Sequence, residues 1–115
     1  MEQFMLIFHG GADAAKSFSS AETMQAHMGK WFAWIEKLKK NGQYVSGEAL
    51  LPGGKFITGS GKTVTDGPYT EGKEVVGGYF IIKAKDMNEA IGISTSDFPE
   101  FEYGGSVQVR QVMKL

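Results

Sequence analysis

Apolar and alternating stretches along the chain predict the strands of one sheet. The first, FMLIFH, is apolar throughout and stops at Gly10-Gly11, which is typical of a buried strand that ends in a turn. The last, SVQVRQV, alternates between apolar and polar positions, as a half-buried strand does. Strand-forming residues also flank Gly59-Ser60-Gly61, which predicts a small hairpin. The predicted strands cover residues 4–9, 43–50, 75–84 and 106–112, and the hairpin covers residues 55–65.

A long helix is predicted between the first two strands. Ser19 and Glu22 have the spacing of a capping box, and the apolar positions after them recur every three or four residues as far as Leu38. Lysines follow, and then Gly42, as is typical of a helix C-terminus. We therefore expect a helix over residues 20–40.

A second, shorter helix completes the predicted order of elements. Asp86 and Glu89 repeat the cap spacing, and MNEAIGIST after Asp86 has weak helix propensity. The stretch SDFPEFEYGG that follows is predicted to be a loop. The order is then strand, helix, strand, hairpin, strand, helix, strand, which predicts a ferredoxin-like α+β sandwich with both helices on one face of a four-stranded antiparallel sheet. The 115 residues have the length of one domain, so we expect a single domain over residues 1–115.

The first strand indicates how the uncovered face of this sheet is buried. Its residues are apolar on both alternations, so apolar side chains should also lie on the face without helices. A bare apolar face is a liability unless it is covered. The simplest cover is a second copy of the chain, and we expect a homodimer.

Composition excludes several classes of function. The chain has a formal net charge of −1, so it lacks the basic footprint of a protein that binds nucleic acid or an anionic membrane. It has no cysteine, which excludes disulfides, thiolate nucleophiles and cysteine-based metal sites. No apolar run approaches the length of about 18 residues that spans a bilayer, and the N-terminal residues lack a signal-peptide pattern. We expect a cytoplasmic protein with neither nucleic acid nor membrane as its partner.

One end of the predicted sheet gathers the residues with useful titration chemistry. The end of the first strand, the start of the first helix, the loop from Asp66 to Glu74 and the end of the second helix meet there. His27 lies about 60° from the centre of the apolar stripe on its helix, between Trp31 and Trp34. Two interpretations stay open: a half-buried histidine that only packs and hydrogen-bonds, or a general acid or base on a cleft wall.

The other candidates at that end also have structural alternatives. His9 is either a ligand-binding residue or the usual polar end of a strand. Asp66-Gly67-Pro68 has the composition of a turn, and a rigid turn can also aim the Asp66 carboxylate into a site. No H-x-x-x-H or H-x-H spacing supports a metal site, and no glycine-rich motif precedes a helix. We expect no metal and no cofactor.

A motif-bearing block lies at the centre of the chain, where Asp66-Gly67-Pro68 is followed by Lys73-Glu74 and Gly77-Gly78-Tyr79. Together with FMLIFHG, HMGKWFAWIEKLKKNGQYVSGEAL and GGSVQVRQV, it makes nearly the whole chain resemble the YCII-related family, in the branch known for an Asp-Gly-Pro-Phe (DGPF) motif. Tyr69 stands where the branch has phenylalanine, and Gln111 where it usually has proline. The resemblance implies a dimeric α+β barrel, in which two ferredoxin-like sheets pack face to face.

The resemblance also suggests where a site would lie. Similar barrels host enzymes that act on small molecules without a cofactor, such as muconolactone isomerases and certain monooxygenases. The family's prototypes carry a proposed pair, a histidine on the first helix and an aspartate just before a proline after the second. The aspartate corresponds to Asp97, with one residue inserted before Pro99. Lys30 takes the place of the histidine, and His27 lies one helical turn earlier.

The first hypothesis of function is a small-molecule-binding protein with acid–base chemistry. The ligand would be a small organic molecule, carboxylate or lactone-like, and the reaction an isomerisation, lactone opening or elimination next to a carbonyl, which needs proton transfer and no cofactor. His27 would be the base or acid, and Asp66 or Asp97 would orient it or carry its own proton. The residues expected to bind the molecule are His9, Trp31, Trp34 and Arg110. The two tryptophans would form walls of the cleft, and Arg110 would hold an anionic group if it faces the barrel interior.

The second hypothesis is an accessory or regulatory protein. Its homodimer would bind a protein partner, such as a sigma factor, through a surface outside the dimer interface. Such a surface would need an exposed apolar or charged patch.

Overall fold

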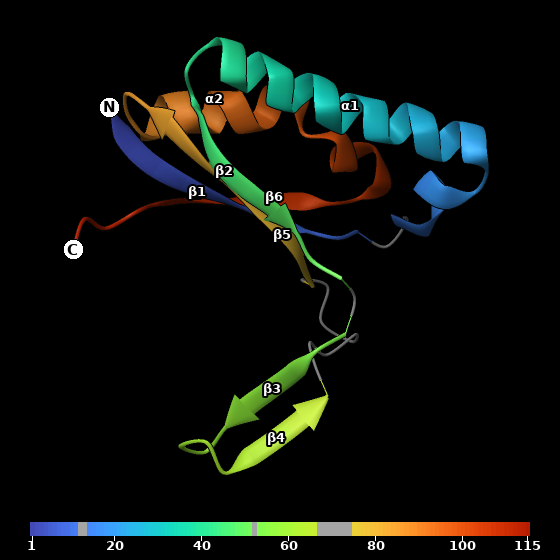
Figure 1. The fold of residues 1–115 in the computed structure, drawn as a ribbon, viewed down its shortest axis with the longest axis vertical. Coiled ribbons are helices and arrows are strands. Elements are labelled where there is room, and N and C mark those ends of the chain that lie inside the picture. Colours follow the sequence, from blue (N-terminus) through green and yellow to red (C-terminus); the bar gives the residue numbers. More distant parts are fainter. Residues whose placement is uncertain (12–13, 52, 67–74) are drawn as a thin grey trace.

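The structure is a computed structural model that describes residues 1–11, 14–51, 53–66 and 75–115, and its elements follow in the predicted order (Figure 1). The strands are β1 (Glu2–His9), β2 (Tyr44–Ala49), β3 (Lys55–Thr58), β4 (Thr63–Asp66), β5 (Val76–Ala84) and β6 (Ser106–Gln111). The helices are α1 (Ala21–Lys40) and α2 (Met87–Asp97), with the 3-10 helices η1 (Ala14–Phe18) and η2 (Pro99–Tyr103). The predicted α+β class is confirmed.

Four strands form an antiparallel sheet in the order β2-β5-β1-β6, and both helices lie on one side of it (Figure 1). This is the ferredoxin-like arrangement that the order of elements predicts. The β3–β4 hairpin forms a separate two-stranded sheet, which projects away from the larger sheet on the side opposite to the helices. Its turn places Ser60 at φ 59°, the left-handed region that Gly59 and Gly61 also occupy.

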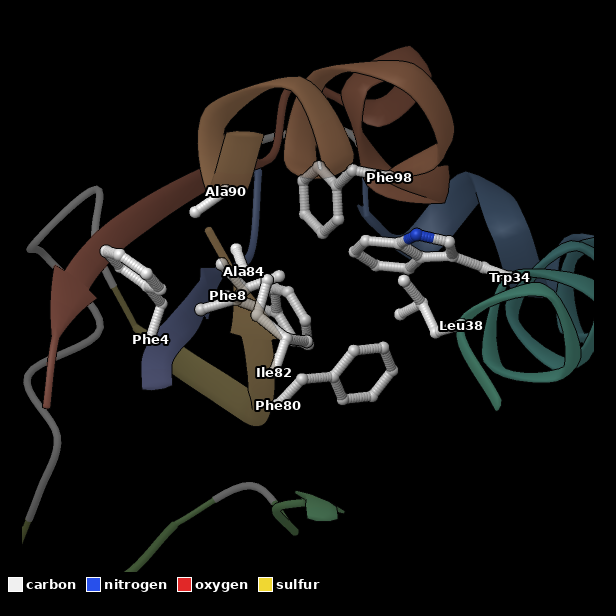
Figure 2. Packing of buried hydrophobic residues seen from close by; sticks show 10 residues of the cluster. Phe4, Phe8, Trp34, Leu38, Phe80, Ile82, Ala84, Ala90 and Phe98 are labelled. Carbon is white, nitrogen blue, oxygen red and sulfur yellow. The ribbon is translucent and has the colours of Figure 1, made fainter. Parts of the chain in front are cut away.

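The core fills the space between the sheet and the helices (Figure 2). Alternate residues of β1 and β5 face the helices because side chains along a strand point to opposite faces in turn. Phe4 pairs with Ile82 and Leu6 with Phe80 across the two strands. The remaining buried apolar residues are Phe8, Trp34, Leu38, Ala84, Ala90 and Phe98.

Side-chain caps fix where both helices begin. Ser20 caps α1, since its hydroxyl oxygen accepts a hydrogen bond from the Thr23 N–H at 3.0 Å. The predicted capping box at Ser19 is therefore wrong by one residue, because Ser20 is the serine with the extended backbone that an N-cap needs. Asp86 caps α2 as predicted and accepts from the Glu89 N–H at 2.9 Å. Within the described ranges, no helix is both long and apolar enough to cross a membrane.

The segment after α2 forms η2, where the sequence predicts a loop. Pro99 occupies its first turn, where a missing N–H is tolerated, and Gly104 ends it in the left-handed conformation at φ 79°. The Gly105 N–H then donates to the Glu100 carbonyl oxygen at 2.8 Å. A Cβ on Gly105 would lie 2.7 Å from the Cβ of Glu100, so the chain can pass this close to Glu100 only with glycine at position 105. These contacts hold Glu100 in place at the edge of the core.

The face of the sheet opposite to the helices is largely apolar. Met5 and Ile7 on β1 lie beside Ile81 and Tyr79 on β5, and all four side chains are partly exposed. Both helices lie on the other side, so this face is open in the single chain (Figure 1). The prediction that β1 is apolar on both alternations and leaves a bare face is consistent with this arrangement.

Gly77 and Gly78 offer a matched test of how closely β2 and β5 pack. A Cβ on Gly78 would lie 2.6 Å from the Glu48 carbonyl oxygen, whereas a Cβ on Gly77 would meet no described atom within 4 Å. We expect Gly78→Ala to lower the free energy of unfolding by about 1–3 kcal/mol, because the strands must separate to admit the methyl group. Gly77→Ala should change it by less than about 0.5 kcal/mol. Urea unfolding followed by circular dichroism measures both, and equal effects would contradict the prediction.

Candidate functional site

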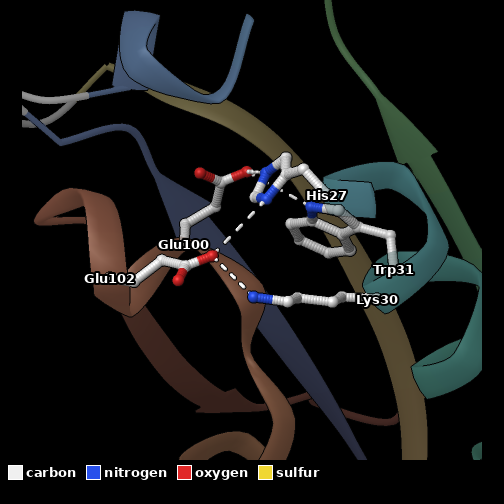
Figure 3. A network of polar contacts seen from close by, with 5 residues as sticks. All are labelled: His27, Lys30, Trp31, Glu100 and Glu102. Atoms are coloured by element: carbon white, nitrogen blue, oxygen red, sulfur yellow. Dashed lines mark hydrogen bonds and ion pairs between the residues drawn. The ribbon is translucent and has the colours of Figure 1, made fainter. Parts of the chain in front are cut away.

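α1 presents His27 and Trp31, one helical turn apart, to the carboxylate of Glu100 on η2 (Figure 3). The Nε2 atom of His27 lies 2.6 Å from Glu100 Oε1, and the Trp31 Nε1–H donates to the same oxygen at 3.2 Å. The His27 side chain is only 3% exposed, while that of Glu100 is 22% exposed. The pair thus joins a buried imidazole to a carboxylate that reaches the surface of the core.

The other ring nitrogen of His27 faces a second carboxylate. Its Nδ1 atom lies 3.9 Å from Glu102 Oε1 and has no hydrogen-bond partner among the described residues. Lys30 Nζ donates to that oxygen of Glu102 at 2.9 Å, and this bond, with the negative charge of Glu102, raises the pKa of Lys30. The ring of Tyr103 packs edge-on against the imidazole, with 5.1 Å between ring centres. His27 is therefore enclosed by protein groups on both sides of its ring.

A cavity of about 450 Å³ lies between α1 and the adjoining ends of β1, β2 and β5, and we call it the α1 cavity. Its described lining is mainly apolar and includes the aromatic residues Phe8, Phe18, Trp31, Phe32, Tyr44 and Phe80. Glu100 belongs to the lining, whereas His27 does not. The group that can meet a ligand is therefore the carboxylate, and the imidazole stands behind it.

His9 also lines the α1 cavity, at the point where β1 ends. The strand register shifts between Phe8 and His9, as at a β-bulge, so that His9 pairs with Val76. Its side chain is 9% exposed, and its Nδ1 atom has no hydrogen-bond partner among the described residues. Of the residues predicted to bind a ligand, His9 and Trp31 are the two that the structure places in the wall of this cavity.

Trp34 lies in the core and does not line the α1 cavity. It is 2% exposed, and its ring packs against those of Phe8 and Phe80, with 5.8 Å and 5.0 Å between ring centres. Sequence reasoning paired it with Trp31 as a second pocket wall. The two tryptophans therefore have different surroundings on α1. Trp31 lies at the rim of the core, where it lines the cavity, and Trp34 lies at the centre of the core.

Asp97, the counterpart of the family's aspartate, lies apart from His27. It ends α2, and Lys37 Nζ donates to its Oδ2 atom at 2.9 Å. Lys37 follows His27 by ten residues on α1, a distance of about 15 Å along the helix axis. The hydrogen bond from Lys37 holds the pKa of Asp97 below its ordinary value of 3.8, against an opposing effect of partial burial. The expectation that Asp97 orients His27 therefore does not fit the geometry.

Asp66 is likewise remote from the pair. It is the last residue of β4, its side chain is 91% exposed, and it forms an ion pair with Lys55 across the hairpin. The sequence placed Asp66 in a loop at the sheet end, whereas the β3–β4 ladder extends to Asp66, which therefore ends a strand of the separate two-stranded sheet. Residues 67–74, which include Gly67-Pro68 and Lys73-Glu74 of the motif-bearing block, lie outside the described residues.

Arg110 lies on the far side of the sheet. It is exposed on β6, beside Met5 of β1, and Met5 belongs to the face opposite to the helices. Its side chain therefore does not line the α1 cavity. A role for Arg110 in holding an anion would belong to that open face.

Glu100 is the residue that sequence reasoning missed. The segment SDFPEFEY was predicted as a loop, and the spacing of its acidic residues did not by itself indicate a functional site. The usable signal is Pro99, which favours the first turn of a helix and would have predicted η2 directly after α2. With η2 in place, the acidic residue next to Pro99 becomes the natural partner for His27.

Comparison with known proteins agrees with the fold and assigns no reaction or ligand. A family model described as the YCII-related domain matches residues 3–115. A search of curated proteins found no match. The roles of the individual residues are therefore argued from their contacts alone.

The ion pair of Asp97 and Lys37 predicts a small, pH-dependent contribution to stability. The folded-state pKa of Asp97 is lowered, so its ionised form stabilises the fold above about pH 4, and this stabilisation is lost as pH falls through the folded-state pKa. We expect Asp97→Asn to lower the free energy of unfolding by less than about 1 kcal/mol at pH 7, the scale of a solvent-screened pair. The difference from wild type should shrink as pH falls below about 4 and vanish once the carboxyl is protonated in the folded state as well.

Urea unfolding across this pH range measures the effect, and Lys37→Met supplies the control. In the Lys37→Met background, Asp97→Asn should change little at any pH because the partner is already absent. A difference that persists unchanged in acid would contradict the assignment.

Proposed function

The chain belongs to the YCII-related family, and from the geometry of its own residues we propose that it binds a small, mainly apolar organic molecule in the α1 cavity and transfers a proton to or from it through Glu100. One observation carries the proposal. A carboxylate held by two donors from α1 forms part of the wall of an aromatic cavity. A volume of about 450 Å³ lies within the range of small-molecule sites.

The two oxygens of Glu100 have different roles in this proposal. Both contacts from α1 fall on Oε1, which fixes the carboxylate in one orientation and leaves Oε2 for a ligand. Placed within reach of an acidic C–H group, this free oxygen can act as a general base.

His27 acts in this proposal as a positioning residue. At 2.6 Å, a proton lies between Nε2 and Oε1, whichever of the two groups carries it. The imidazole fixes the carboxylate through this bond and can take up or return a proton without contacting the ligand. The reaction class that fits is proton transfer beside a carbonyl or another activating group, as in an isomerisation or elimination.

A general probe of carboxylate bases tests the proposal. Base removes the ring C–H proton of 5-nitrobenzisoxazole, the N–O bond breaks, and a coloured cyanophenolate forms. We expect the protein to accelerate this reaction, and Glu100→Gln to lower the rate at least about tenfold because the amide cannot take the proton. The amide still accepts from Trp31, so the variant should stay folded, which circular dichroism verifies.

Two matched variants sharpen this test. Glu102→Gln removes a neighbouring carboxylate outside the cavity lining, and Asp97→Asn removes the counterpart of the family's aspartate. Both should retain most of the wild-type rate. Wild-type protein and Glu100→Gln with the same rate would overturn the role of Glu100, and loss of activity in Asp97→Asn alone would restore the original assignment.

We propose further that the open face of the sheet pairs with that of a second copy. Met5, Ile7, Tyr79 and Ile81 would lie at the centre of this interface, which would close two sheets into a barrel as family membership implies. Two copies of one apolar face suit the isologous contact of a twofold dimer. The support is the apolar character of the face and its freedom from the helices in the single chain.

Ile7→Lys tests this interface, with Ile91→Lys as its control. Ile7 lies on the open face, whereas Ile91 is exposed on α2 on the other side of the sheet. We expect wild type and Ile91→Lys to sediment as dimers and Ile7→Lys as a monomer, because the buried ammonium would lack a partner. A melting temperature that rises with protein concentration in the wild type would agree. A monomeric wild type would refute the interface.

A further inference from the structure

The phenol of Tyr44 reaches the wall of the α1 cavity along β2. Gly47 pairs with Phe80 of β5, whose ring faces the helices, so Gly47 lies on the cavity side of the sheet. A Cβ on Gly47 would lie 2.8 Å from the Tyr44 hydroxyl oxygen, so the phenol extends over Gly47. Both residues line the cavity. The hydroxyl is therefore placed where a ligand in this cavity can meet it.

This hydroxyl is a hydrogen-bond donor that the described part of the chain does not use. It makes no hydrogen bond with any described residue, and the ring is held by packing edge-on against Phe80, with 5.3 Å between ring centres. Burial raises the pKa of the Tyr44 phenol, so its O–H stays protonated at neutral pH. A protonated phenol donates one hydrogen bond, here to an acceptor on a ligand.

Packed aromatic rings connect Tyr44 to the Glu100 carboxylate. The rings of Tyr44 and Trp31 both lie edge-on to Phe80, with 5.3 Å and 5.9 Å between ring centres. Trp31 in turn donates to Glu100. The cavity thus offers a hydrogen-bond donor from β2 and a proton acceptor from η2, with apolar rings between them.

From this pairing we propose that the α1 cavity takes unsaturated carbonyl compounds, and that Tyr44 is a catalytic residue whose O–H binds the carbonyl oxygen. The inference rests on the proposed function, because Glu100 supplies the base. A carbonyl group meets both demands of the site, since its oxygen accepts a hydrogen bond and it acidifies the adjacent C–H. Walls made of aromatic rings suit the flat carbon skeleton of an unsaturated compound.

The reaction is the shift of a C=C bond into conjugation with the carbonyl group. Glu100 Oε2 takes a proton from the carbon between the two double bonds, and the electron pair of that C–H bond moves onto the carbonyl oxygen. The Tyr44 O–H stabilises the resulting dienolate where its negative charge develops. The same carboxyl then returns the proton to the far end of the C=C bond, so atoms and electrons balance without a cofactor. Enzymes use a carboxylate base with a phenol donor for this kind of isomerisation.

Binding of 1-indanone tests the hydrogen bond from Tyr44 apart from any reaction. An O–H donor lowers the stretching frequency of a carbonyl group, and an isotope-labelled carbonyl separates this infrared band from those of the protein. We expect a lowered frequency in wild type and in Glu100→Gln, and a return toward the value in apolar solvent in Tyr44→Phe. Titration calorimetry should give Tyr44→Phe about a three- to tenfold higher Kd for 1-indanone, the scale of one hydrogen bond.

Two controls show whether the cavity itself is intact. Indane, the hydrocarbon without the carbonyl oxygen, should bind wild type and Tyr44→Phe equally. Tyr79→Phe removes the same group from the open face of the sheet, outside the cavity lining, and should match wild type in every measurement. Tyr44→Phe keeps the ring that packs on Phe80, so circular dichroism should show the wild-type fold.

Conversion of 3-cyclohexenone to 2-cyclohexenone tests the reaction, and the ultraviolet absorbance of the conjugated product follows it. We expect the wild type to accelerate this isomerisation. Tyr44→Phe should lower kcat at least about tenfold, because one donor to the developing oxyanion is lost. Glu100→Gln should lower kcat as well, because the amide cannot take the proton.

Each outcome bears on a separate part of the proposal. The same carbonyl frequency and rate in wild type and Tyr44→Phe would overturn the role of Tyr44, and so would a frequency that changes in His9→Gln instead, since His9 also lines the cavity. A wild type that does not bind 1-indanone would overturn the substrate class, and carbonyl binding through Tyr44 without isomerisation would overturn the dienolate step. Glu100→Gln at the wild-type rate would refute the proposed function separately, because the infrared band does not depend on a base.

Discussion

A carboxylate that is largely removed from water needs hydrogen-bond donors in place of its lost hydration. The geometry of this site depends on the donors that Glu100 finds on α1. Leaving such a charge unpaired costs several kcal/mol, which is comparable to the whole stability of a small domain. His27 Nε2 and Trp31 Nε1 converge on one of its oxygens, so η2 must lie against the first half of α1. The wall of the α1 cavity follows from this placement.

Several polar contacts tie α1 to the segment from Asp97 to Glu102, and they differ in exposure. Lys37 with Asp97 and Lys30 with Glu102 are solvent-exposed pairs, which contribute little to stability individually. The contact of His27 with Glu100 is the buried one. The positions that the family resemblance marks for chemistry, Lys30 and Asp97, thus hold the helices together, and a histidine–carboxylate pair occurs one turn away. His27 and Glu100 each lie three residues from these positions, so the kind of pair is kept while its two residues differ.

The sequence predicts the fold well because the fold rests on periodicity and caps. The apolar run of β1, the alternation of β6 and the stripe of α1 leave few other arrangements, and the caps mark where the helices start. The site is predicted less well because its members come from separate elements whose approach no local pattern records. His27 was placed at the boundary of the apolar stripe, and only the position of η2 decides that it is buried. Asp66 was misplaced because a hairpin ladder can extend by one residue without any change in composition.

Three glycines lie at the end of the sheet that adjoins the cavity beside α1. Gly47, Gly77 and Gly78 all belong to its lining, and a Cβ on Gly47 would lie 2.5 Å from the ring of Phe80. Protein interiors are otherwise close-packed, and a void forfeits contacts on its lining atoms. At Gly77 a side chain would meet no described atom within 4 Å, so the close packing of the strands does not itself require glycine there. The ligand proposed above would occupy this space, between its aromatic side chains and the carboxylate that His27 and Trp31 hold.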